Sequence, residues 1–108
     1  MDWVLASSGD KSVREVIFRL LGSDKRLMDF LFESEKPRLR KRAGILKEDA
    51  WFFSHGEQLL IRTALDFWSG SGHVALWELL ESLDEENLRR VVVAIVEIRK
   101  VRDVIHAN

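Results

Sequence analysis

Histidines and clustered carboxylates are the side chains of this 108-residue chain that could do acid–base or metal chemistry near neutral pH. His55, His73 and His106 are scattered, without the spacing of a metal site or of a nucleophilic triad. An acidic cluster consists of Glu78, Glu81, Asp84, Glu85 and Glu86. Its last three members stand at the predicted start of a helix, where negative charge offsets the helix dipole. We therefore predict no catalytic residue, no cofactor and no metal, and favour a protein that is not an enzyme.

One segment, residues 36–47 (KPRLRKRAGILK), is rich in positive charge. Its cations are Lys36, Arg38, Arg40, Lys41, Arg42 and Lys47. Such a cluster can neutralise phosphates, and the aromatic residues 51–53 that follow it could stack on bases. Acidic neighbours on both sides and a formal net charge of −1 favour a solvated, ion-paired face instead. A nucleic-acid-associated domain that uses residues 36–47 is therefore our alternative prediction.

The stretch from Asp66 to Leu83, DFWSGSGHVALWELLESL, resembles the loop and exiting helix of an EF-hand. With Glu78 at the twelfth loop position, Gly72 falls on the sixth and Val74 on the eighth, as in that family. Phenylalanine and serine occupy the first, third and fifth positions, where the family has carboxylates or asparagine. The resemblance implies a weak calcium site. The leading interpretation is a Gly/Ser turn between two packed helices, and we expect no small-molecule ligand.

Composition places the chain among ordinary globular proteins, with 46% hydrophobic and 32% charged residues. The absence of cysteine excludes disulfides and thiolate chemistry. We find no signal peptide and no apolar run long enough for a membrane span, and so expect a cytoplasmic protein without membrane contact. No segment alternates apolar and polar residues as a strand does. These features predict an all-α protein, a single compact bundle of five to six helices joined by short loops, over residues 1–108.

Capping and breaking residues place the predicted helices. Residues 1–10 are predicted to form a loose arm, and the first helix to start at a capping box of Ser12 and Glu15. The predicted helices run from Ser12 to Gly22, from Ser23 or Asp24 to about Ser34, from Pro37 to Ala43, from Ser54 to about Trp68, from Val74 or Ala75 to about Leu83, and from Asp84 to Ile105. A further turn or two is predicted within Lys47–Phe53, whose aromatic residues we assign to the core. We expect the fourth and last of the major helices to be central and most contacts to join sequential neighbours.

The final helix carries two apolar faces. A wide arc that we predict to be buried contains Leu88, Val91, Val92, Ile95, Val96 and Ile98. A second strip, on the opposite side, contains Val93, Val101, Val104 and Ile105, and Trp77 is a candidate for another exposed contact. This strip either packs on the N-terminal arm or meets a second molecule. We therefore predict a non-enzymatic protein-interaction or structural module whose partner is another protein or a second copy, giving a homodimer through the C-terminal helix.

Overall fold

A computed structural model describes the backbone of residues 3–36 and 38–106 and the side chains of residues 11–36 and 38–103. Its elements are α1 (Trp3–Leu20), α2 (Lys25–Leu31), α3 (Ala43–Asp49), the 3-10 helix η1 (Ala50–Phe52), α4 (His55–Ser69), α5 (Leu76–Ser82) and α6 (Glu85–His106). In the described part of the chain these helices are joined by loops and one isolated β-bridge, without a strand. The predicted all-α class is confirmed.

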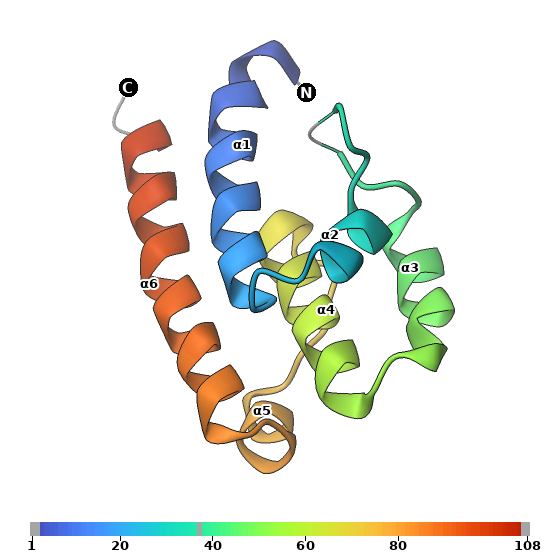
Figure 1. Cartoon of the computed structure of the whole chain (residues 1–108). Helices are drawn as coiled ribbons and strands as arrows, with labels where there is room; N and C mark the ends of the chain where they lie inside the picture. The colour runs from blue at the N-terminus through green and yellow to red at the C-terminus, as the bar shows by residue number, and fades with distance from the viewer. Residues whose placement is uncertain (1–2, 37, 107–108) are drawn as a thin grey trace.

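The first and last helices lie side by side and antiparallel, as Figure 1 shows. The buried face of α1 is formed by Val13, Val16, Ile17 and Leu20, which follow the three- and four-residue spacing of one helix face. Helix α4 is central, because it contacts α1, α3, α5 and α6. Helix α6 lies at the periphery and not at the predicted centre, and no described element lies on its outer side. The expectation that sequential neighbours make most contacts is therefore wrong, since the pair most distant in sequence packs most extensively.

Local capping signals set most helix ends correctly. The hydroxyl of Ser54 accepts from the amide of Glu57, whose carboxylate accepts from the amide of Ser54, both at 3.1 Å. The side chain of Asp24 caps α2, and that of Asp84 accepts from the Asn87 amide at the start of α6. Gly22 follows α1 with a φ of 74°, a left-handed conformation that glycine adopts without strain. These predicted signals are confirmed.

Helix α1 starts well before its predicted position. Residues 7–10, predicted as a loop, are helical, and Ser12 lies inside the helix rather than at its start. Serine and glycine lower helix propensity by only about 0.5–1 kcal/mol each, which does not stop a helix that continues into a buried face. The side chains of residues 1–10, and with them the predicted contact between this arm and the C-terminal strip, lie outside the described residues.

The predicted helix over Pro37–Ala43 is wrong. The chain here forms a loop closed by an antiparallel bridge between Phe32 and Leu39, and the next helix, α3, begins at Ala43. The guanidinium of Arg14, in α1, donates to the backbone carbonyls of Glu33 at 3.3 Å and Lys36 at 3.4 Å. The contacts of Arg14 and the bridge between Phe32 and Leu39 hold this segment as a loop, and the local pattern does not contain these distant contacts. Pro37 lies outside the described residues.

Candidate interaction surface

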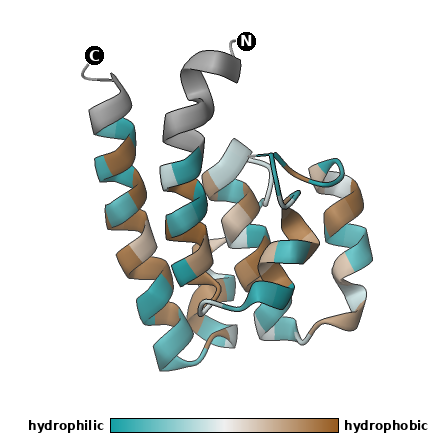
Figure 2. Ribbon diagram, turned by 45° about the horizontal axis from the view of Figure 1, so that its top comes forward, coloured by the Kyte–Doolittle hydropathy of each residue, from teal (hydrophilic) through white to brown (hydrophobic). Residues whose placement is uncertain are grey.

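Helix α6 buries a narrower face than its apolar residues would allow. Val91, Ala94 and Ile98 are 2%, 2% and 5% exposed, at the spacing of one helix face. The residues Val92, Val93, Ile95 and Val96, hereafter the outer strip, are each about half exposed, between 47% and 54%. Figure 2 shows that no element covers the outer side of this helix. The predicted burial of Val92, Ile95 and Val96 with Val91 is therefore wrong, because α1 and α4 cover only one edge of the apolar arc.

The residues that the sequence predicts to contact a partner (Val93, Val101, Val104 and Ile105) do not form one exposed strip. Val93 is 48% exposed and belongs to the outer strip. Val101 is partly buried and packs against the core instead. The side chains of Val104 and Ile105 lie outside the described residues. The exposed surface of α6 is therefore centred on its middle turns rather than on its last two.

Each end of the outer strip carries an exposed ion pair. Near the start of α6, Glu85 has a side chain that is 89% exposed and lies 3.4 Å from Arg89. Near the end, the Arg99 side chain is 84% exposed and lies 3.9 Å from Asp103. Both pairs are long and solvated, so they contribute little to the folded chain.

A groove of about 340 Å³ runs along the seam of α1 and α6, beside the outer strip. Its apolar lining comes from Val16, Leu20, Val93 and Ala94. Its rim carries two ion pairs, Arg19 with Glu97 and Arg90 with Glu86. Val93 belongs to both the groove and the outer strip, so the two form one continuous surface. This surface can hold an apolar side chain and pair charges around it.

Two further apolar clusters are exposed away from α6. On α5, Leu76, Trp77 and Leu80 are 74%, 63% and 68% exposed. Trp77 is thus exposed as expected, and Leu76 and Leu80 are exposed with it, whereas Leu79 is buried. Helix α5 has only seven residues and meets the core through one edge, so most of its side chains face outward.

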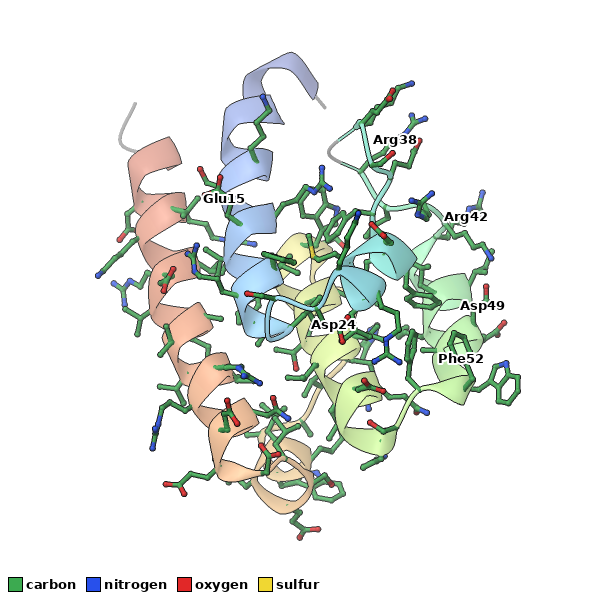
Figure 3. All side chains as sticks on the ribbon, viewed as in Figure 1. Glu15, Asp24, Arg38, Arg42, Asp49 and Phe52 are labelled. Atoms are coloured by element: carbon green, nitrogen blue, oxygen red, sulfur yellow. The ribbon has the colours of Figure 1, made fainter. Side chains whose placement is uncertain are left out.

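The other cluster lies at α3 and η1, where Trp51, Phe52 and Ile45 are 78%, 59% and 44% exposed. Figure 3 shows Arg42 and Asp49 on the outer side of this segment, whereas the half-exposed ring of Phe52 lies 6.1 Å from that of Phe30 in α2. Only Phe53 of the three consecutive aromatic residues is buried, with its ring 5.0 Å from that of Phe30. The assignment of all three to the core is therefore wrong, because the 3-10 turn directs neighbouring side chains to different sides.

The basic segment is largely ion-paired or hydrogen-bonded within the chain. Arg38 pairs with Glu33, and Arg40 donates to the carbonyl of Asp29. The ammonium of Lys41 lies 2.7 Å from Asp49, and that of Lys47 donates to the carbonyl of Ser71 at 2.7 Å. For Lys36 and Arg42, both exposed, no side-chain partner is found among the described residues. A shallow hollow of about 460 Å³ is lined by Glu33, Arg38, Leu39, Arg40, Lys41, Arg42 and Trp68.

The loop that resembles an EF-hand uses its carboxylates internally. Asp66 accepts from the amides of Gly72, His73 and Val74 at 2.8, 3.0 and 3.1 Å. Glu78 accepts two hydrogen bonds from Arg62, at 3.0 and 3.2 Å. Because these carboxylate oxygens already accept hydrogen bonds from the chain, the loop is a turn capped by its own neighbours. Separately, no cluster of three metal-ligating side chains exists in the described part of the chain.

Arg62, in α4, pairs with a carboxylate on the next helix and not with Asp66, which lies one turn away on its own helix. Its guanidinium crosses to Glu78 on α5 and also donates to the carbonyl of Gly72 at 3.1 Å. Hydrogen bonds from Arg62, and then from the amide of Ala75, lower the pKa of Glu78 below its ordinary value. This pair joins α4 to α5 and has a structural role.

No protein-family model, no curated protein and no solved structure matches this chain. Within the described residues, no helix has both the length and the apolar character to cross a membrane.

Proposed function

We propose that this chain is a non-enzymatic helical protein-interaction module whose contact surface is the outer strip of α6. One observation carries the proposal: four half-exposed aliphatic side chains follow one another along the middle of the longest helix, and no part of the described chain covers them. Burying the exposed half of each would contribute roughly 1 kcal/mol per side chain. Contiguous apolar surface of this kind marks interaction sites in proteins that fold as monomers.

The titratable groups support the same interpretation. Among the described residues, the pKa is clearly shifted only at Arg26, Glu33 and Glu78, each of which takes part in a surface ion pair. Active sites gather perturbed groups in a cleft, where one group acts on another or on a substrate. Here the three lie in separate pairs that tie loops and helices together. Their placement favours a structural role for each.

Site-specific photo-crosslinking tests this function. A photoreactive amino acid is placed at Val92 or at Val96 and the protein is irradiated in its native host. We expect protein adducts from both positions. The control carries the same group at Glu48, an exposed residue of α3 on another side of the molecule. Adducts that form equally from Glu48, or from neither strip position, would contradict the proposal.

A second candidate function, nucleic-acid binding, draws on the exposed aromatic residues beside the basic segment. Trp51 and Phe52 are available for stacking, and Arg42 has no partner among the described residues. On this alternative, single-stranded nucleic acid should bind with an affinity that falls steeply with salt, and Arg42→Glu with Trp51→Ala should abolish binding. Lys25→Glu, which reverses an exposed charge on α2, is the control. Failure to bind heparin at low salt would count against this candidate.

A further inference from the structure

We infer that the partner of the outer strip is a second copy of this chain, with the two α6 helices packed antiparallel around a two-fold axis. The inference rests on the proposed function, because it specifies the occupant of the same surface. It depends on how charge and apolar residues are distributed along α6. It also depends on the limited area that the strip offers.

Residues on the exposed side of α6 follow the alternating three- and four-residue spacing of a helix-pairing seam. In order along the helix they are Glu85, Leu88, Val92, Ile95, Arg99 and Arg102. Leu88 is partly buried and packs against the core, so it lies at the edge of the exposed side, whereas Val92 and Ile95 are 54% and 47% exposed. The row therefore has an acidic end, an apolar middle and a basic end.

Charge complementarity selects the direction of pairing. A parallel copy would place Glu85 beside Glu85 and Arg99 beside Arg99, which is repulsive. An antiparallel copy with its axis between residues 93 and 94 places Val92 against Ile95, and Glu85 against Arg102. Leu88 then meets the aliphatic stem of Arg99. Because a two-fold axis repeats every contact, one favourable pair becomes two.

The charges at both ends are free to make these contacts. Glu85 and Arg99 are almost fully exposed, and their bonds within the chain are long and solvated. Arg102 donates one N–H to the carbonyl of Phe67 at 3.0 Å, and its guanidinium has further donors for a carboxylate. No internal contact of comparable strength is lost when the second copy binds.

The area of the strip sets the strength of the dimer. A stable interface buries about 800 Å² on each partner, and four half-exposed aliphatic residues supply only part of this. The α1–α6 groove adds no area to this contact, because its residues Glu86, Arg90, Val93 and Glu97 lie on the other side of α6 from the row. We therefore expect a reversible dimer that dissociates on dilution. Sedimentation velocity over a concentration series measures this directly.

Cysteine crosslinking tests the antiparallel arrangement of the two α6 helices. The sequence contains no cysteine, so only the introduced residues can react. Glu85→Cys and Arg102→Cys are made in separate chains and treated with a short bis-maleimide, singly and mixed. The antiparallel dimer predicts a crosslink in the mixture and none from either variant alone, since like positions would lie about 25 Å apart along the seam. Crosslinking of each variant to itself would show parallel pairing and overturn the inference.

Charge reversal supplies an independent test on exposed positions that leave the fold intact. Arg102→Glu and Glu85→Arg should each weaken the dimer at least several-fold, and the double exchange in one chain should restore it. Val92→Glu should give a monomer with an unchanged circular dichroism spectrum. A dimer that none of these changes affects would overturn the inference.

The inference and the proposed function can fail separately. A wild-type chain that sediments as a monomer at every concentration overturns the self-pairing. If Val92 and Val96 still crosslink to a different host protein, the proposed function holds without it. If the chain is monomeric and these positions give no adduct, both are overturned.

Discussion

At position 72 the packing leaves room only for a hydrogen atom. A methyl group built on Gly72 would lie 1.8 Å from the carbonyl oxygen of Arg62 and 2.7 Å from its carbonyl carbon. These are backbone atoms of α4, so they cannot rotate away. The loop would have to move, and its hydrogen bonds to Asp66 would break.

We therefore expect Gly72→Ala to lower the free energy of unfolding by about 2–3 kcal/mol, measured by urea denaturation. Gly44→Ala is the matched control, because a methyl group there meets no atom within 4 Å and the residue lies in α3. That variant should be as stable as the wild type or up to about 1 kcal/mol more stable. Equal losses from both changes would show that the loop does not pack on α4 as described.

The pair of Glu78 and Arg62 makes stability depend on pH. Hydrogen bonds from Arg62 and from the amide of Ala75 lower the pKa of Glu78 in the folded state from its ordinary value of 4.5. A carboxyl group with a lowered folded-state pKa stabilises the fold above its unfolded pKa. That contribution is lost as the pH falls through the folded value. The contribution of Glu78 is therefore complete at neutral pH and absent in strong acid.

Glu78→Gln should accordingly be less stable than the wild type at neutral pH. The difference should shrink toward zero as the pH falls below the folded pKa. Urea unfolding at a series of pH values measures it. Glu81→Gln, which changes an exposed carboxylate on the same helix, should show a small difference throughout. A deficit for Glu78→Gln that persists in acid would mean that the amide fails to pack, and that charge is not the cause.

At the scale of elements, α6 gives the clearest test of the fold. Val91 and Val92 are neighbours in sequence, but their exposed fractions are 2% and 54%. We expect Val91→Ala to cost about 2 kcal/mol in unfolding free energy and Val92→Ala less than about 0.5 kcal/mol, measured on dilute, monomeric protein. A larger loss from Val92→Ala would mean that α6 is rotated about its axis from the position described.

The same helix shows what the sequence can predict. Capping residues such as Ser54 and Asp84 act on amides within one turn, so local patterns predict where α4 and α6 begin. The buried face of α6 is different, because its apolar arc is wider than α1 and α4 can cover. Ala94 is buried although it is not part of the predicted apolar arc. It is buried because α1 packs against this side of α6.

The candidate site was predicted only in outline, for a related reason. The sequence directs attention to the C-terminal helix and to an apolar face for a partner, but to residues nearer its end. Which apolar face remains exposed depends on contacts between residues far apart in sequence. The basic segment follows the same rule: Lys47 binds the carbonyl of Ser71, 24 positions away, and Arg14 anchors the loop that contains Lys36. Such pairings leave no mark in local spacing.

At the scale of the whole molecule, the pairing of the first and last helices makes the fold depend on both ends of the chain. Ile17 and Leu20 of α1 are 0% and 1% exposed, and α6 contributes Val91 and Ile98 to the same core. Without α6, a chain ending at Leu83 would expose the buried side of α1. We therefore expect residues 1–83 alone to lack a cooperative unfolding transition.

A peptide of residues 84–108 should restore that transition when added to residues 1–83, because it supplies the missing cover for α1. Circular dichroism and a thermal melt would detect the recovery. The peptide with Val91→Asp and Ile98→Asp should fail, whereas the peptide with Val92→Asp and Val96→Asp should succeed, since the latter pair lies on the outer strip. Cooperative folding of residues 1–83 without any peptide would contradict this dependence. It would mean that α2, α3 and α4 cover α1 sufficiently by themselves.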